Sequence, residues 1–187
     1  MIAKLPPGAR GARDHALLLV GFAAALRRSE LVALDLVDVV KRQQGLVVNI
    51  RRSKTDQEGA GRRVGVPYGS DPLTCPVRAV EASCQAGRIE ESALFLSFDR
   101  RGRLTQDRLS RSAVPRIVRR AVAATGADPT PYSAHSLRAG LATAAAAAGV
   151  SERSIMAQTG HRSLVVARGY IREGSLFREN AAAAVGL

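Results

Sequence analysis

Residues 13–30 read RDHALLLVGFAAALRRSE, an apolar segment that ends in a charged cluster. The nearly continuous apolar content of residues 13–26 predicts a helix that is buried over most of its surface. A second, short helix is expected over residues 29–34, with Ser29 as its N-cap, because a serine hydroxyl accepts a hydrogen bond from a free backbone N–H. The segment therefore places Arg27 at a junction between two helices, beside a buried core.

Downstream of this helix pair, alternating apolar and polar residues predict three short strands, Val37–Arg42, Leu46–Arg52 and Arg62–Pro67. Gln43-Gln44-Gly45 is expected to form the first hairpin turn, and residues 56–61 a longer second turn. Consecutive strands joined by short turns pair antiparallel. The sequence therefore predicts one small three-stranded antiparallel sheet.

The rest of the chain has the pattern of a helical protein. Eight arginines and one acid lie between Arg100 and Arg120. The apolar stripe in this stretch predicts a helix that either begins near Ser112, with Pro115 in its first turn, or is kinked at the proline. Further helices are expected over residues 76–88, 134–148 (after Ser133 as its cap), 151–158, 163–171 and 176–185. The predicted fold class is α+β, mainly α, with residues 1–12 as a linker or tail and a single domain over residues 13–187.

The chain is strongly basic. Its 187 residues carry 28 Lys and Arg against 16 Asp and Glu, which gives a formal charge of +12. Arginine dominates, and because its planar guanidinium suits phosphate oxygens, nucleic acid is the simplest partner. A GC-rich coding sequence produces the same excess of alanine and arginine, so composition alone does not separate the two explanations.

Cysteine usage and hydropathy narrow the class of protein further. Cys75 and Cys84 are too few for a disulfide framework and have no neighbours at metal-ligand spacing. We therefore expect reduced thiols in a cytoplasmic protein without a metal site. The longest apolar runs, residues 16–26 and 141–150, are too short to span a bilayer, and no signal peptide is recognised, so no membrane partner is expected.

Two pairs of polar residues stand at helix starts. His135 and Arg138 lie at positions i and i+3 in the first turn of a predicted helix, where free N–H groups attract an anion. The pair could hold a phosphate and move a proton, or it could be an ordinary solvated helix start. Arg27 and Glu30 could form a surface ion pair that contributes little, or Glu30 could hold an active-site cation or histidine in place.

Lys54, His161 and Tyr170 complete the set of candidates. Lys54 lies at the tip of the second hairpin, from which a lysine can protonate a leaving oxygen, although most hairpin lysines are only solvated. His161 follows Gly160, where a helix is expected to stop, and an exposed loop histidine is the alternative interpretation. Tyr170 lies in the next helix. Most tyrosines are packing residues, but a phenol becomes a nucleophile when a base and positive charge favour its phenolate.

Taken in this order, the motifs resemble those of the tyrosine recombinase family, also called the phage integrase family. Residues 25–31, Ala-Leu-Arg-Arg-Ser-Glu-Leu, are similar to the first arginine box of the family, with Ala25 in place of the usual glycine. Residues 51–56 resemble the hairpin lysine box, and residues 135–138 resemble the HxxR box. Gly160-His161 followed by Tyr170 resembles the last box. The resemblance covers the chain from Arg13 to about Ala184, and the ordered set is specific although each box is modest.

The resemblance implies a tyrosine-recombinase catalytic-domain fold and a reaction that needs no cofactor and no metal. Tyr170 would attack a DNA phosphodiester to form a 3′-phosphotyrosyl bond and a free 5′-hydroxyl, and religation would follow strand exchange. Lys54 would protonate the leaving oxygen, and His135 would assist removal of the Tyr170 proton. Glu30 would support His135 and the arginines. The non-bridging phosphate oxygens would be bound by Arg27, Arg138 and His161.

The implied partner is a double-stranded DNA recombination site. We expect Arg108, Arg111 and Arg116 to meet phosphates or major-groove edges. Family members carry an N-terminal core-binding domain that clamps the far side of the DNA. We expect that domain to be absent here, which would weaken DNA binding by the catalytic domain. The last predicted helix, Leu176–Val185, is expected to dock on a neighbouring subunit of a homo-tetramer on DNA.

Two other functions fit part of the same residue set. A type IB topoisomerase uses similar catalytic groups, but the short chain and the close spacing of His161 and Tyr170 favour a recombinase. A non-catalytic DNA-binding relic of the fold would not need the complete catalytic set that this chain contains.

Overall fold

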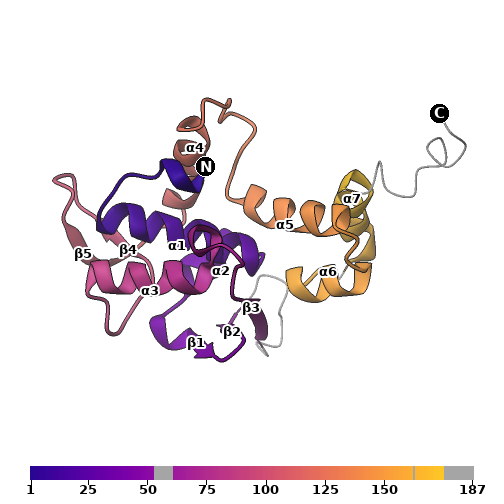
Figure 1. The fold of residues 1–187 in the computed structure, drawn as a ribbon, viewed down its shortest axis with the longest axis horizontal. Helices are drawn as coiled ribbons and strands as arrows, with labels where there is room; N and C mark the ends of the chain where they lie inside the picture. The colour runs from indigo at the N-terminus through magenta and orange to yellow at the C-terminus, as the bar shows by residue number, and fades with distance from the viewer. Residues whose placement is uncertain (53–60, 162, 175–187) are drawn as a thin grey trace, which may run out of the picture.

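The computed structural model describes residues 1–52, 61–161 and 163–174. The helices are α1 (Ala9–Ala23), α2 (Arg28–Ala33), α3 (Pro76–Gly87), α4 (Ala113–Ala123), α5 (His135–Ala147), α6 (Glu152–Thr159) and α7 (Leu164–Gly174), and the strands are β1 (Val39–Arg42), β2 (Gly45–Ile50), β3 (Arg62–Pro67), β4 (Leu96–Phe98) and β5 (Leu104–Arg108). Figure 1 shows α1, α3 and the strands on one side of the molecule and α6 and α7 on the other, with α5 between them. The mainly helical α+β class predicted from the sequence is confirmed.

The first three strands form one antiparallel sheet in the order β1-β2-β3, as predicted. Across β2 and β3, for example, Val48 pairs with Val64. β1 begins later than predicted because residues 36–38 form a 3₁₀ turn. In that turn, the Asp38 carboxylate accepts a hydrogen bond from the backbone N–H of Asp35 at 2.9 Å. The predicted strand order and pairing are therefore confirmed, and only the ends of the strands differ from the prediction.

The sequence pattern does not predict the second, two-stranded sheet. β4 and β5 pair antiparallel. The Asp99 carboxylate holds the turn between them by accepting hydrogen bonds from the N–H groups of Arg101 and Arg103, both at 2.9 Å. These strands are short and β5 is mostly polar. Their alternation therefore does not stand out within the arginine-rich stretch.

α1 begins at Ala9, four residues before the predicted start, so residues 9–12 are helical and not part of a tail. Alanine and arginine are strong helix formers and extend the helix toward the N-terminus. Two charged side chains of this helix are buried. Arg13 donates to the Asp14 carboxylate at 2.7 Å and to the backbone carbonyl of Leu96 at 2.6 Å. This pair fixes α1 against β4.

The starts of α4 and α5 follow the sequence closely. α4 begins at Ala113, which places Pro115 in the first turn, where a missing N–H leaves no helical hydrogen bond unmade. This was the first of the two predicted alternatives. α5 begins at His135, one residue later than expected, and its N-cap is Ala134 and not the predicted Ser133. The Ser133 hydroxyl nevertheless accepts a hydrogen bond from the His135 N–H at 3.2 Å. The predicted last helix, Leu176–Val185, lies outside the described residues.

α1 is the centre of the hydrophobic core. Its Leu17 and Leu18 are buried, and the helix packs against both α3 and α5. α5 belongs to two clusters, because Leu137 packs into the main core whereas Ala142 and Ala146 pack with α6 and α7. α5 therefore ties the position of α6 and α7 to the main core (Figure 1).

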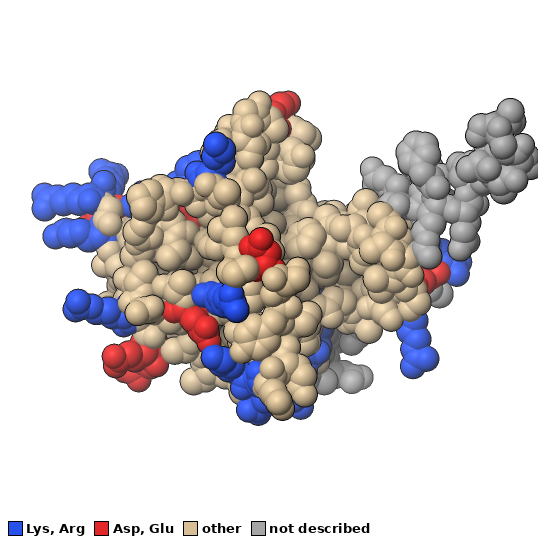
Figure 2. Space-filling view, viewed as in Figure 1, with Lys and Arg blue, Asp and Glu red and all other residues tan. Residues whose placement is uncertain are grey.

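The surface is basic at its edges. On the face drawn in Figure 2, Lys and Arg side chains gather at the end that carries β4 and β5 and along the edge over the three-stranded sheet, whereas the middle of the face carries a few charged side chains of both signs. Within the described ranges, no helix is both long and apolar enough to cross a membrane. Cys75 and Cys84 are free thiols, as predicted.

Gly45 gives a test of the sheet. Its φ is 148°, and an added Cβ would lie 2.1 Å from the carbonyl oxygen of Val66. We expect Gly45→Ala to lower the free energy of unfolding by about 2 kcal/mol or more, measured by urea denaturation. Gly65→Ala is the matched control, because a Cβ on Gly65 in the neighbouring strand would meet no atom within 4 Å. Equal stability of the two variants would contradict the close approach of Gly45 to Val66.

Candidate active site

The junction between α1 and α2 holds the Arg27–Glu30 pair. Arg27 is the residue that caps α2, and Ser29 lies inside the helix, contrary to the prediction. The Arg27 backbone N–H donates to Glu30 Oε2 at 3.0 Å, and its guanidinium donates to Oε1 at 2.7 Å. A carboxylate accepts stronger hydrogen bonds than a hydroxyl does. Because Glu30 is only 3% exposed and Arg27 is half-buried, the pair is not a surface ion pair.

Arg138 is held in the second buried position of the site. It is 1% exposed, and its NH1 donates to the Ala25 carbonyl at 2.8 Å and to the Thr159 carbonyl. Ala25 lies at φ 50°, a left-handed conformation that costs an alanine about 1 kcal/mol. Burial, and then the charge of Arg27, lower the pKa of Arg138 to about 10. The guanidinium is therefore charged at neutral pH and is fixed by the backbone on both sides.

The other terminal nitrogen of Arg138 indicates that the site binds a ligand. Arg138 NH2 is buried and has no hydrogen-bond partner among the described residues. Buried donors are nearly always paired in folded proteins. A cation with an unpaired donor beside Arg27 is suited to an anion with several oxygens, such as a phosphodiester.

Tyr170 meets His135 from the opposite side of the site. The hydroxyl of Tyr170, in α7, lies 2.5 Å from His135 Nε2 at the start of α5. Burial lowers the pKa of His135, and the charges of Arg138 and Arg27 lower it further. His135 is therefore neutral at pH 7, which leaves a ring nitrogen able to accept the phenolic proton.

His161 stacks on the same tyrosine. It follows Gly160, which ends α6 in a left-handed conformation at φ 65°. The two rings lie 5.9 Å apart between centroids at an angle of 17°. Burial, followed by the charges of Arg138 and Arg27, lowers the pKa of His161 to about 4. His161 Nδ1 lies 2.9 Å from the Thr159 hydroxyl.

The structure thus brings together six of the seven residues singled out for catalysis or its support, from elements that are distant in sequence. Lys54 lies outside the described residues, so its predicted role stays a prediction. The described strand that follows it, β3, reaches the site, because Arg62 NH2 lies 3.4 Å from Glu30 Oε2. The six residues are Arg27, Glu30, His135, Arg138, His161 and Tyr170.

Arg62 is a site residue that the sequence analysis missed. Besides its contact with Glu30, its NH1 donates to the carbonyl of Gln158 at 3.0 Å, and a Cβ on Gly160 would lie 3.0 Å from its Nε. Burial lowers the pKa of Arg62, and Glu30 opposes that shift. The alternation of β3 was the available signal, since Arg62 shares a strand face with the buried Val64.

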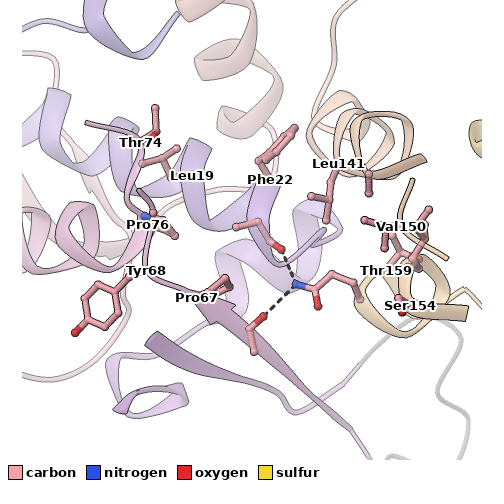
Figure 3. A pocket seen from close by; sticks show the side chains of 16 residues that line it. Leu19, Phe22, Pro67, Tyr68, Thr74, Pro76, Leu141, Val150, Ser154 and Thr159 are labelled. Atoms are coloured by element: carbon pink, nitrogen blue, oxygen red, sulfur yellow. Dashed lines mark hydrogen bonds between the residues drawn. The ribbon is translucent and has the colours of Figure 1, made fainter. Parts of the chain in front are cut away.

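Gln158 links the helix before His161 to the rest of the body. Its side-chain amide donates to the carbonyl of Ala23 at 2.7 Å and to the carbonyl of Gly65 at 3.1 Å. Figure 3 shows these bonds as dashed lines at the edge of an apolar pocket. The end of α6 is therefore tied to α1 and β3, which fixes the turn that carries His161.

The three arginines predicted to contact DNA have different surroundings. Arg108 donates to the carbonyls of Val32 and Leu34 and, at 2.5 Å, to the Asp35 carboxylate. Its guanidinium therefore has a structural role that the sequence did not indicate. Arg111 and Arg116 are exposed. Their contacts with DNA stay predictions.

Metal chemistry has no visible ligand set in the described part of the chain. No group of three or more His, Cys, Asp and Glu side chains there is arranged to hold a metal ion. The site is instead built from cations, one buried carboxylate, two neutral histidines and a phenol. These groups can bind a phosphate and transfer protons.

Comparison with known sequences agrees with the family resemblance of the motifs. The sequence model described as Phage integrase family matches residues 1–175. An integrase/recombinase xerD homolog from Selenomonas ruminantium is 37% identical over 171 residues, covering 91% of this chain and 50% of the relative. Tyrosine recombinase XerD from Xanthomonas axonopodis pv. citri is 32% identical, covering 82% of this chain and 48% of its own length. The chain spans about half the length of these curated relatives.

Solved structures share the fold. A XerH site-specific recombinase bound to a palindromic difH substrate, in a post-cleavage complex, matches with a TM-score of 0.74 at 16% identity, covering 100% of this chain and 49% of that one. XerA recombinase matches with a TM-score of 0.67 at 22% identity, covering 90% and 57%. At these identities the likeness concerns the fold alone.

The shifted histidines predict how stability depends on pH. The pKa of His161 is 6.5 ordinarily and about 4 in the folded protein, so the unfolded chain binds this proton first as the pH falls. The stability from this group is therefore complete above a pH of about 6.5 and is lost as the pH falls to about 4. The lowered pKa of His135 acts in the same direction.

We expect the free energy of unfolding to decline across this window more steeply in the wild type than in His161→Phe. Phenylalanine preserves the stacking on Tyr170 but cannot bind a proton. Urea denaturation at stepped pH measures the effect. Parallel pH profiles of the two proteins would contradict a buried, neutral His161.

Proposed function

We propose, because this chain belongs to the phage integrase family of tyrosine recombinases, that it cleaves and rejoins DNA with Tyr170 as the nucleophile. The observation that carries the proposal is the 2.5 Å contact between the Tyr170 hydroxyl and His135 Nε2, beside the buried Arg138. A phenol is a poor nucleophile at neutral pH until its proton is removed. A neutral histidine and neighbouring cations supply what that step needs.

In the proposed reaction, the Tyr170 oxygen attacks the phosphorus of a phosphodiester and forms a 3′-phosphotyrosyl bond. His135 takes the phenolic proton, and the bond to the 5′ oxygen breaks. Lys54 protonates that oxygen, which leaves as a 5′-hydroxyl. A 5′-hydroxyl, from the same or another strand, then reverses the step. The energy of the phosphodiester is kept in the covalent intermediate, so rejoining needs no cofactor.

The cations of the site stabilise the transition state in this proposal. Arg138 NH2, unpaired among the described residues, and the guanidinium of Arg27 meet the non-bridging oxygens. His161, which stacks on Tyr170, joins them. Glu30 holds Arg27 and contacts Arg62, which orders the cations before the DNA arrives. Donors that need no rearrangement contribute most to stabilising developing charge.

Double-stranded DNA is the proposed substrate, and a row of hollows supports a path for it. One hollow is lined by Arg51 and Arg52 together with Glu30 and Asp38, and the next shares Arg51 with it and adds Arg108, Arg111 and Asp35. The third, reached through Leu109 and Ser110, is lined by five arginines, Arg10, Arg13, Arg100, Arg116 and Arg120. Arginines outnumber acids in the second and third hollows, and this arginine track suits the phosphate backbone of a duplex that extends away from the active site.

A second copy of the chain is the proposed protein partner, in a tetramer on DNA. The apolar pocket in Figure 3 lies between α1, α5, α6 and the end of β3, and is lined by Phe22, Leu141 and Val150 among others. It suits the apolar residues of the segment Leu176–Val185 from a neighbouring subunit. Sedimentation of DNA complexes formed with and without residues 176–187 measures this association of subunits.

The cytoplasm is the proposed location, in keeping with a DNA substrate and two free thiols.

A covalent-capture experiment tests the reaction. The chain is incubated in EDTA with a pool of nicked duplexes whose core sequence is randomised, and adducts that resist SDS are recovered. We expect an adduct with the wild type and none with Tyr170→Phe. Tyr132→Phe, at an exposed tyrosine outside the site, is the matched control and should form the adduct.

Each contrary outcome has a distinct meaning. No adduct from the wild type would reject catalysis by this chain and favour a DNA-binding relic. Adducts formed equally on every duplex would favour topoisomerase chemistry over site-specific recombination. An adduct that persists in Tyr170→Phe would assign the nucleophile to another residue.

The arginine track predicts different effects for two of its members. Arg116→Ala should weaken DNA binding and lower the slope of log affinity against log salt by about 0.9, the value for one lost phosphate contact. Arg108→Ala should also lower the free energy of unfolding by about 1–3 kcal/mol, because Asp35 and two backbone carbonyls lose their donor. Fluorescence anisotropy at several salt concentrations and urea denaturation measure the two quantities. An unchanged salt slope in Arg116→Ala would remove that residue from the DNA path.

A further inference from the structure

Thr159 is a buried polar residue that the proposed reaction does not use. It is the last residue of α6, and none of its surface is exposed. Its hydroxyl oxygen lies 2.9 Å from His161 Nδ1. The residue between them, Gly160, is left-handed at φ 65°. The hydroxyl therefore belongs to the immediate surroundings of His161.

The single hydrogen of that hydroxyl is committed to the helix. Thr159 Oγ1 lies 2.8 Å from the carbonyl oxygen of Ile155 and 3.4 Å from that of Met156. A carbonyl oxygen only accepts, and a threonine in a helix commonly donates to the carbonyl four residues earlier. If the hydrogen pointed at His161 instead, two buried oxygens would lie 2.8 Å apart with no hydrogen between them, which is unfavourable.

The hydroxyl can therefore only accept from His161. The hydrogen of that contact sits on His161 Nδ1. A neutral imidazole carries one N–H, so Nε2 then holds a lone pair. Among the described residues Nε2 has no hydrogen-bond partner, which leaves it for a ligand.

The surroundings keep this ring neutral in the free protein. Among the residues that the structure describes, the charged and titratable groups that face His161 are Arg138 and His135 from α5, Arg27 from the start of α2 and Arg62 from β3, with Tyr170 of α7 stacked on it. None of these groups is a carboxylate. A lone pair on Nε2 would repel a phosphate oxygen, whereas Nε2–H⁺ would donate to it. The charge of the phosphate favours that protonation.

We propose that Thr159 is a positioning residue for His161: it fixes the hydrogen on Nδ1, so that Nε2 binds a DNA phosphate only after taking up one proton from solvent. The step forms one N–H bond on Nε2 and converts the imidazole to imidazolium. The role of this protonation in DNA binding rests on the function proposed above. The tautomer of His161 in the free protein is independent of that function.

Nitrogen NMR of the free chain tests the tautomer. Long-range ¹H–¹⁵N correlations at pH 8 distinguish a protonated from a bare ring nitrogen, and the chain has three histidines to assign. We expect His161 to carry hydrogen on Nδ1. His15 is an internal control of the opposite kind, because its Nε2 lies 2.7 Å from the carbonyl of Leu73 and must donate to it.

Two variants isolate the hydroxyl. Thr159→Val keeps the shape but removes the acceptor, so hydrogen should move toward His161 Nε2, and Thr159→Ser should restore the wild-type spectrum. Proton uptake on DNA binding, from calorimetry in buffers of different ionisation enthalpy, should fall in Thr159→Val and recover in Thr159→Ser. Hydrogen on Nε2 in the wild type would overturn the proposal even if Thr159→Val fails to fold.

The outcomes separate the two proposals. The Nδ1–H tautomer without a covalent adduct would leave the role of Thr159 intact and reject catalysis. An adduct that depends on Tyr170, together with an Nε2–H tautomer, would reject the role of Thr159 alone. Equal proton uptake by the wild type and both variants would also reject it.

Discussion

The burial of the Arg138 guanidinium is the constraint on which the site depends. A buried cation is stable only where its donors meet acceptors, and here the acceptors are two backbone carbonyls from different parts of the chain, those of Ala25 and Thr159. The same bonds hold the end of α1 against the end of α6. They therefore set the positions of Arg27 and His161, each of which lies two residues beyond one of these carbonyls.

The remaining electrostatics follow from placing several cations together. Glu30 is the buried carboxylate that faces them, and it binds Arg27 and Arg62. Burial, together with the positive charge of the arginines, lowers the pKa of His135 and His161 and keeps both rings neutral. A site of this kind binds an anion strongly and provides ring nitrogens that can take up protons. The charge that makes the free site unfavourable is the charge that a phosphate neutralises.

Particular residues show how much of the site could be predicted from the sequence. Tyr170 and His135 were both identified from motifs, and their 2.5 Å contact agrees with the pairing of roles that the resemblance implied. Arg62 was missed because Arg62-Arg63 looks like any charged pair in a strand, although alternation places one of the two inward. Arg108 was assigned to DNA because an arginine in a basic stretch looks exposed, and its bonds to the end of α2 are contacts over more than seventy residues. Sequence patterns carry little information about such distant partners.

By itself, the sequence determined the local features: the three-stranded sheet, the helix starts at Ala113 and near His135, and the identity of the catalytic candidates. The sheet and the helix starts depend on propensities and turns that act within a few residues, whereas the catalytic candidates were identified from short motifs that resemble those of a known family. Only the tertiary structure decided which groups meet, because that depends on how α1, α5 and α7 pack. It also decided that Arg27 and not Ser29 is the N-cap of α2, with the Glu30 carboxylate accepting the hydrogen bond from the Arg27 N–H. The direction of a single buried hydrogen, between Thr159 and His161, is likewise set by atoms that only folding brings together.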